Sequence, residues 1–258
     1  NASYNCLDRH LETKAQKNAL LWEAEDGQKK ALSYKKLHQE VSEFAKVLKN
    51  LGIEEGDIVS IYLPMIPELA VAMLACARIG ACHNVIFAGF SAEALEKRNQ
   101  LASAKALIGA DYTLRNGKKI DLLKTINNSL SGSKSLESLI LFNRSEKKLK
   151  LSHCPKSLKV YDWKTLLEQN AGQTEKAQAF DSEQALFTLF TSGSTGTPKG
   201  LVHTTAGYLL QASLSLKTVF GTCENDLFWT TADYGWITGH SYGLYGPLSL
   251  GLTTLMYE

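Results

Sequence analysis

Short apolar segments typical of buried strands alternate with helical segments along nearly the whole chain. We expect strands near residues 57–63, 82–87, 106–110, 138–142, 185–190, 227–232 and 252–257. We expect helices near residues 37–51, 67–79, 92–103, 120–128, 163–168, 206–216 and 242–248. Ser33 is a candidate N-cap of the first helix, and Gly52 a candidate residue just past its end. This alternation favours an α/β fold of parallel sheets flanked by helices over a sandwich or a bundle.

The length of 258 residues is enough for one large α/β domain or two smaller ones. A possible subdomain boundary is predicted near residues 170–181, where polar residues replace the apolar pattern. Apolar residues make up 44% and charged residues 21%, which excludes a largely disordered chain. A net charge of +2 gives no electrostatic case for binding nucleic acid or a membrane. The missing initiator methionine suggests that the chain begins inside a longer gene product.

The cysteine pattern favours a reducing compartment. The five cysteines are odd in number and form no C-x-x-C pair, so neither a disulfide framework nor a zinc site is indicated. The most hydrophobic segment, residues 69–77, is about half as long as a membrane span and predicts a buried helix. The N-terminus has no basic region followed by an apolar run, so no secretory signal is indicated. We therefore expect a cytoplasmic protein.

Hydroxyls, glycines and one lysine are concentrated in Thr191-Ser-Gly-Ser-Thr-Gly-Thr-Pro-Lys-Gly200, directly after the predicted strand 185–190. Glycines let backbone N–H groups approach an anion, and hydroxyl and ammonium groups add donors and charge, so this loop predicts a phosphate site. A Walker A loop needs Gly immediately before its Lys, whereas here Pro198 precedes Lys199, which argues against an ordinary P-loop phosphotransferase. A flexible Ser/Gly-rich linker is the alternative that composition alone allows.

Further motifs accompany this loop along the chain. They are Tyr4-Asn-Cys-Leu-Asp-Arg-His10, Leu63-Pro-Met-Ile-Pro-Glu68, Ala75-Cys-Ala-Arg-Ile-Gly80, Val202-His-Thr-Thr-Ala-Gly-Tyr208 and Thr231-Ala-Asp-Tyr-Gly-Trp-Ile-Thr-Gly-His-Ser-Tyr242. With the loop, and in the same order, they closely resemble the acetyl-CoA synthetase family of the adenylate-forming superfamily. The resemblance implies that residues 1–30 form an N-terminal extension. It also implies that residues 31–258 form part of the large N-terminal, AMP-binding domain.

The resemblance implies a two-step reaction whose substrates are acetate, ATP and CoA. Acetate attacks the α-phosphate of Mg-ATP to give acetyl-AMP and pyrophosphate, and the CoA thiol then displaces AMP. The β- and γ-phosphates would be held by donors from Thr191, Ser192, Gly193, Ser194, Thr195, Gly196, Thr197 and Lys199. Thr191 and Lys199 are the catalytic candidates. An ionised carboxylate needs no general base, so His203 and His240 are interpreted as structural or as lining the site.

The resemblance also assigns an acyl pocket and a CoA site. Trp236 would confine the acyl group, with Ile237 and Thr238 completing that wall. The CoA site would comprise Phe87, Ala88, Gly89, Arg115, Asn116, Gly117, Lys118 and Thr238. The CoA adenine would pack on the turn at residues 87–90, and Arg115 and Lys118 would meet the CoA phosphates. Ala88 replaces a glycine of the family and Lys118 stands where the family often has arginine, so weaker CoA binding is expected.

Several expectations concern residues beyond Glu258. The resemblance places the Mg²⁺ ligands, the groups that bind the adenosine of ATP and a small C-terminal domain there, so we predict no metal ligand in this chain and expect the chain alone to be inactive. Two other functions stay open: a propionyl-CoA synthetase of the same branch, and a non-catalytic nucleotide- or CoA-binding module. Only small-molecule partners are expected, and the sequence makes no prediction about oligomeric state.

Overall fold

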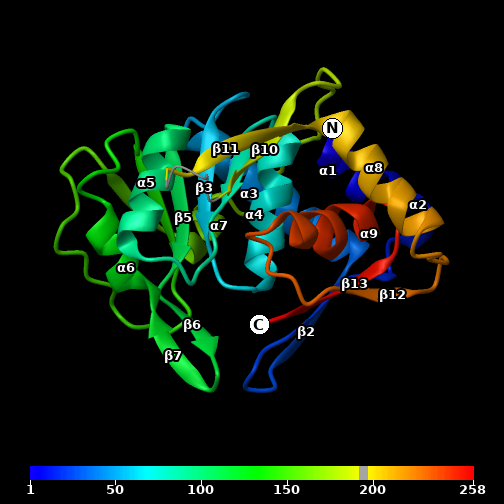
Figure 1. Ribbon diagram of the computed structural model, residues 1–258, viewed down its shortest axis with the longest axis horizontal. Helices are drawn as coiled ribbons and strands as arrows, with labels where there is room; N and C mark the ends of the chain where they lie inside the picture. Colours follow the sequence, from blue (N-terminus) through cyan, green and yellow to red (C-terminus); the bar gives the residue numbers. More distant parts are fainter. Residues whose placement is uncertain (192–196) are drawn as a thin grey trace.

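The computed structural model describes residues 1–191 and 197–258, and most of its strands form one twisted sheet (Figure 1). The order of the seven strands in this sheet is β11-β10-β4-β3-β5-β8-β9. Their bounds are β3 (Ile58–Tyr62), β4 (Cys82–Val85), β5 (Ala106–Ala110), β8 (Ser138–Phe142), β9 (Lys159–Asp162), β10 (Ala185–Thr191) and β11 (Lys199–Thr204). All neighbours pair in parallel except β10 and β11, which are antiparallel. The predicted α/β class of mostly parallel strands is confirmed.

Helices cover both faces of this sheet. They are α3 (Tyr34–Asn50), α4 (Pro67–Ile79), α5 (Ala92–Ala102), α6 (Leu122–Ser129) and α7 (Trp163–Gln169). Helices α3 and α4 pack on each other, as do α5 and α6. Because the chain turns back between β4 and β5, right-handed crossovers place α4 and α5 on opposite faces. The core between these layers includes Cys76, which is fully buried within the segment 69–77 that was predicted to be a buried helix, and all five cysteines are free.

Local signals explain several element bounds. The Ser33 hydroxyl accepts a hydrogen bond from the backbone N–H of Lys36, and Gly52 follows α3 with a φ of 83°, so both predicted ends of this helix are confirmed. Helix α4 begins at Pro67 and ends at Gly80, which has a φ of 76°. A Cβ at Gly80 would also lie only 2.8 Å from the Phe180 ring. Both the positive φ and this close contact therefore require glycine at this position.

A second sheet, in the order β12-β13-β1-β2, joins the two ends of the chain. Its strands are β1 (Asn18–Glu23), β2 (Lys29–Ser33), β12 (Leu227–Trp229) and β13 (Thr253–Tyr257). Strand β1 pairs in parallel with β13, with Leu20 opposite Thr254. The strand predicted over 227–232 is therefore too long, because the chain leaves the sheet after Trp229. A separate hairpin consists of β6 (Tyr112–Arg115) and β7 (Lys118–Asp121).

The remaining elements pack on this second sheet or on the helices next to it. They are α1 (Ala2–Cys6), a 3₁₀ turn at Asp8–His10, α2 (Leu11–Lys14), α8 (Thr205–Thr218), a π-helical segment at Gly239–Tyr245 and α9 (Gly246–Ser249). The helix predicted over 242–248 thus begins earlier, at Gly239, and its first part is wound as a π-helix. Among the described residues, no helix is both long and apolar enough to cross a membrane.

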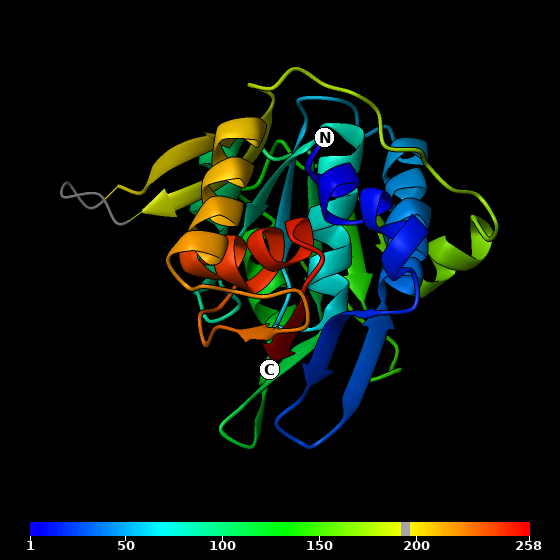
Figure 2. The same cartoon turned by 90° about the vertical axis from the view of Figure 1, so that its right-hand side faces the viewer.

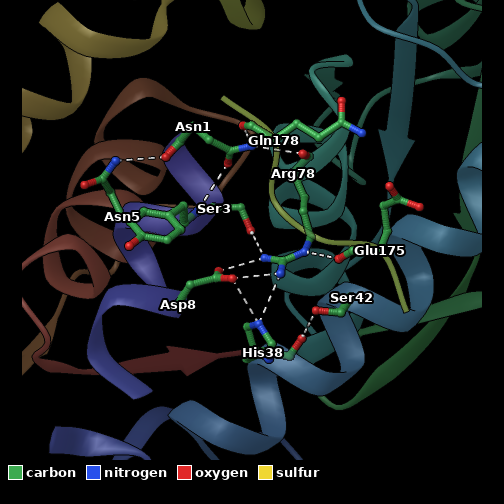
Figure 3. A network of polar contacts seen from close by, with 10 residues as sticks. Asn1, Ser3, Asn5, Asp8, His38, Ser42, Arg78, Glu175 and Gln178 are labelled. Carbon is green, nitrogen blue, oxygen red and sulfur yellow. Dashed lines mark hydrogen bonds and ion pairs between the residues drawn. The ribbon is translucent and has the colours of Figure 1, made fainter. Parts of the chain in front are cut away.

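The N-terminal helices lie against α3 and α4 (Figure 2) and are held there by a polar network around one buried arginine (Figure 3). Its centre is Arg78 of α4, whose side chain is 2% exposed. The Arg78 guanidinium forms an ion pair with Asp8, and its Nε–H donates to the backbone oxygen of Glu175 at 2.6 Å. His38 of α3 contacts the same carboxylate at 3.2 Å. The network therefore joins the first ten residues, two helices and the segment around Glu175. The predicted boundary near 170–181 stays a prediction, as does the division at residue 30.

Candidate functional site

The two ends of the predicted phosphate loop lie opposite each other at the carboxyl edge of the main sheet. Thr191 is the last residue of β10 and pairs with Lys199, the first residue of β11. Both side chains are exposed, as is that of Thr197. A strand rather than a helix follows Lys199, which differs from a Walker A loop and agrees with the interpretation of Pro198. The predicted phosphate ligands Ser192, Gly193, Ser194, Thr195 and Gly196 lie outside the described residues.

The turn that follows β4 leaves the sheet at this same edge. Strands β4 and β10 are parallel with His83 opposite Phe187, so Phe87 and Thr191 each come four residues after a paired position. The Tyr62 hydroxyl lies at hydrogen-bond distance, 2.9 Å, from the backbone oxygens of both Ala88 and Phe90. These contacts attach the turn to the end of β3. The structure thus brings the predicted CoA turn and the ends of the phosphate loop to one edge of two neighbouring strands.

Trp236 lies beside this turn. Its ring centre is 6.2 Å from that of Phe87 and 6.3 Å from that of Phe90, while half of its side chain is exposed. Ile237 and Thr238 are also exposed. The three predicted acyl-pocket residues therefore present free surface next to the predicted CoA turn.

Close backbone packing explains the glycines around Trp236. A Cβ at Gly239 would lie 2.2 Å from the backbone oxygen of Asp233, and one at Gly243 would lie 2.4 Å from the Tyr234 ring. The buried Tyr234 hydroxyl donates to the backbone oxygen of Gly243 at 2.6 Å. The chain folds back tightly on itself here, and it continues as a π-helix, a form often found at functional sites. This packing holds the backbone on both sides of Trp236.

A cavity of about 270 Å³ opens between the turn, the β6–β7 hairpin and the second sheet. Four of the predicted CoA residues line it: Phe87, Ala88, Gly89 and Arg115. Asn116 and Gly117 form the tip of the hairpin just outside, and Lys118 begins β7 with an exposed side chain. The Arg115 guanidinium lies 5.6 Å from the centre of the Phe87 ring. The cavity thus joins two predicted CoA segments that are far apart in sequence.

None of the other residues that line this cavity was predicted as a site residue. They are Glu25, Pro64, Met65, Thr113, Leu114, Ile120, Trp229, Thr230, Thr231, Ala232, Asp233, Tyr257 and Glu258. A signal existed for Pro64, Met65, Thr231, Ala232 and Asp233, because they stand inside motifs that carry the family resemblance. Glu25 and Glu258 had none, since they reach the cavity only through the pairing of β1 with β13.

The carboxylates of this cavity differ in their hydrogen-bond and ion-pair partners. Burial raises the pKa of Asp233 to about 6, although a hydrogen bond from the Gly235 N–H and the charge of Arg115 oppose the rise. Glu258 forms an ion pair with Arg144 and accepts a hydrogen bond at 2.7 Å from its Nη2. Glu25 accepts hydrogen bonds from two backbone N–H groups. Arg115 is therefore the cation that the cavity presents to an anionic ligand, among its described lining residues.

The two candidate histidines lie in an aromatic cluster beneath the carboxyl edge. His240 is fully buried, its ring centre is 4.5 Å from that of Phe187, and burial lowers its pKa to about 3. The half-buried His203 stacks on Phe187, also with 4.5 Å between the ring centres, and burial lowers its pKa as well. Both imidazoles are neutral at physiological pH, which favours the structural interpretation of these residues.

The sequence matches the protein family described as AMP-binding enzyme over residues 7–258. Among curated proteins, it is 46% identical over 259 residues to the acetyl-coenzyme A synthetase of Syntrophus aciditrophicus (strain SB). It is 47% identical over 261 residues to that of Escherichia coli (strain K12). Each alignment covers 100% of this chain and 39% of the relative, so the chain spans about two fifths of the length of these proteins. Among solved structures, acetoacetyl-CoA synthetase from Streptomyces lividans matches with a TM-score of 0.89 and 27% identity, over 100% of this chain and 38% of that one.

Proposed function

Because this chain belongs to the AMP-binding enzyme family, we propose that the whole protein is an AMP-forming acetate:CoA ligase. The observation that carries the proposal is the identity of 46–49% to acetyl-coenzyme A synthetases, which extends over all of this chain. The geometry supports it, because the ends of the phosphate loop, the exposed Trp236 and the cavity beside Arg115 lie along one side of the fold. We propose ATP, acetate and CoA as the substrates.

In the first step a carboxylate oxygen of acetate bonds to the α-phosphorus of ATP, and the bond from that phosphorus to the bridging oxygen of pyrophosphate breaks. Negative charge accumulates on the departing pyrophosphate, so prepositioned donors accelerate the step. Thr191 and Lys199 stand at the two ends of the loop, where they bracket the donors of residues 192–197. We assign to them the β- and γ-phosphates. One such donor is typically worth about 3–4 kcal/mol of transition-state stabilisation.

In the second step the CoA sulfur bonds to the acetyl carbon, AMP leaves with the bridging oxygen, and the thiol proton passes to solvent. The Phe87 ring and the Arg115 guanidinium, which contact each other, offer an aromatic face and a positive charge to the nucleotide end of CoA. Lys118 lies two residues after the Asn116 turn position, on the same hairpin, and adds a second cation. Asn116, Gly117 and Thr238 are the further CoA contacts that we propose.

The acyl group is assigned to the surface formed by Trp236, Ile237 and Thr238. Trp236 contacts the CoA turn through Phe87 and Phe90, so the acetyl carbon and the incoming thiol would meet next to it. A rigid indole excludes longer acids by bulk, which a merely hydrophobic pocket does weakly, at about 1–3 kcal/mol per methylene. The preference for acetate over propionate is therefore assigned to this surface.

Further parts of the proposal concern the rest of the protein. We propose that Mg²⁺ accompanies ATP and takes its ligands from residues beyond Glu258. We assign none of the residues of this chain to the ion. Residues 1–30 are proposed as an N-terminal extension and residues 31–258 as part of the AMP-binding domain. A cytoplasmic location is proposed for the protein.

The test is exchange of labelled pyrophosphate into ATP by the full-length protein, measured with acetate and with propionate. We expect acetate-dependent exchange without CoA, and formation of acetyl-CoA when CoA is added. Exchange that is faster with propionate would make the protein a propionyl-CoA synthetase. Absence of exchange with either acid would leave a binding module and overturn the proposal.

A further inference from the structure

The β6–β7 hairpin, which carries Arg115, stands apart from both larger sheets. It forms a sheet of its own, and an isolated two-stranded hairpin has little stability in water. Figures 1 and 2 show it projecting from the body beside the turn between β1 and β2. The position of Arg115 therefore depends on what anchors this hairpin.

The base of the hairpin is anchored by Glu258 at the end of β13. The backbone N–H of Leu114 donates to the Glu258 carboxylate at 3.2 Å, and the Thr113 hydroxyl donates to the same oxygen at 3.3 Å. Arg144 neutralises this carboxylate and also lies 4.6 Å from the centre of the Tyr112 ring. These contacts fix the start of β6 but do not reach the tip.

The tip is anchored by Glu25, which lies in the turn between β1 and β2. The Asn116 N–H donates to one oxygen of its carboxylate and the Gly117 N–H to the other, each at 2.9 Å. Asn116 and Gly117 have φ values of 53° and 70°, as in the tight turns that join two strands directly. One carboxylate thus binds both central amides of the turn, and Arg115 is the residue immediately before them.

The same geometry determines where Arg115 lies. A Cβ at Gly89 would be 3.1 Å from Arg115 Nη1, so the guanidinium packs closely over the Phe87–Phe90 turn. A shift of the tip would move the guanidinium away from this turn. Glu25 also lines the cavity, but its two oxygens are already occupied by the amides of the hairpin.

We infer that Glu25 is a positioning residue for CoA: by binding the Asn116 and Gly117 amides, it holds Arg115 over the Phe87 ring, where the anionic nucleotide end of CoA binds. This inference rests on the proposed function. It assigns a role in the second step to the N-terminal 30 residues, which contribute none of the predicted ligand contacts.

The experiment compares wild-type full-length protein with Glu25→Gln and Glu25→Ala. Glutamine carries a donating NH2 group in place of one of the two oxygens that accept these N–H groups, and alanine carries neither oxygen, so we expect each variant to raise the KM for CoA about five- to tenfold. The kcat at saturating CoA and the acetate-dependent pyrophosphate exchange, which uses no CoA, should stay unchanged. Glu23→Gln is the matched control. Glu23 is the last residue of β1, two residues before Glu25, and among the described side chains it forms an ion pair only with the exposed Lys29.

Three outcomes would overturn the inference. The KM for CoA could stay within about twofold of wild type in both variants. It could fall, which would mean that Glu25 acts on CoA as a repelling charge. Exchange could decline together with thioester formation, which would mean a general loss of structure. Backbone hydrogen exchange provides a second readout, since the Asn116 and Gly117 amides should exchange faster in the variants while amides of the main sheet do not. If wild-type protein shows no exchange, the proposed function itself fails.

Discussion

Arg78 and Asp8, 70 positions apart in the sequence, form a two-pronged ion pair in which Nη1 and Nη2 each lie 2.8 Å from a carboxylate oxygen. Such paired geometry is the strongest that arginine and carboxylate adopt. The arginine is almost fully buried, and its remaining N–H groups are directed at Ser3, His38 and the backbone oxygen of Glu175. The pair therefore attaches the N-terminal segment to the centre of the fold.

Replacing Arg78 with methionine should destabilise the protein by about 3–5 kcal/mol, because it leaves the Asp8 carboxylate without its main partner in a largely buried place. Urea unfolding followed by tryptophan fluorescence measures the change. Arg9→Met is the matched control, since the exposed Arg9 forms a side-chain hydrogen bond only with Asn5 among the described residues, and it should change stability by less than about 0.5 kcal/mol. Equal effects of the two substitutions would contradict this role for the pair.

The same pair predicts a pH dependence of stability. Burial alone would raise the pKa of Asp8, but hydrogen bonds from His38 and Arg78 and the charge of Arg78 lower it from 3.8 to about 2. Because the pKa in the folded state is the lower one, this contribution to stability is complete above about pH 4 and is lost as the pH falls towards 2. Asp8→Asn should therefore lose most stability near pH 6 and progressively less below pH 4. A constant difference between pH 6 and pH 2.5 would refute the assignment.

The glycines near Trp236 predict a contrast between two alanine substitutions. Gly239→Ala would place a Cβ 2.2 Å from the Asp233 backbone oxygen, so the backbone must shift, at a cost of about 1–3 kcal/mol. Because that shift moves Trp236, the rate of acetyl-AMP formation should fall as well. Gly207→Ala is the control in α8, where nothing lies within 4 Å of the new Cβ, and it should stabilise the helix by about 0.5–1 kcal/mol. Unfolding curves and pyrophosphate exchange measure both effects.

The parts of the fold that the sequence predicts well are those with local signals. Pro67 and Gly80 mark both ends of α4, and the apolar strands β5 and β8 have the predicted bounds. Strand β1 lacks such a signal, because its partner β13 lies more than two hundred residues away. Strand β11 is the exposed edge strand of the main sheet, and buried and exposed residues do not alternate along it. Its sequence therefore resembles that of a loop. Pairing between distant segments decides these elements, and local pattern does not report it.

The candidate site likewise contains residues that the motifs predicted and contacts that they did not predict. Motif resemblance found Phe87, Arg115 and Trp236, which the structure brings together around one turn. It predicted Asn116 and Gly117 as ligand contacts, which stays a prediction, but it did not indicate that they form the turn of a hairpin with positive φ values. The anchoring of that turn by Glu25 depends on where two hairpins meet, which no stretch of sequence records.

Asp233→Asn should stabilise the protein at neutral pH. Burial raises the pKa of Asp233 from 3.8 to about 6, so ionising this carboxyl at pH 7–8 costs stability that the neutral amide does not lose. The asparagine oxygen can still accept the hydrogen bond from the Gly235 N–H. We expect a gain of about 1–2 kcal/mol at pH 8 that disappears below pH 4, where both side chains are uncharged. Urea unfolding at several pH values measures it, and a gain that does not grow from pH 4 to pH 8 would contradict the raised pKa.

Trp236→Ala separates the two roles that its position allows. If the indole confines the acyl group, the substitution should reduce the preference for acetate over propionate by about tenfold or more, as measured by the ratio of kcat/KM values in pyrophosphate exchange. If it only supports the Phe87–Phe90 turn, the acid preference should stay constant while the KM for CoA rises. Trp229→Ala is the matched control, because Trp229 is 52% exposed against 50% for Trp236 and lines the cavity from the second sheet. That control should leave the acid preference unchanged, since Trp229 lies outside the proposed acyl surface. A constant acetate preference in Trp236→Ala would therefore remove Trp236 from the acyl pocket while leaving the proposed CoA site in place.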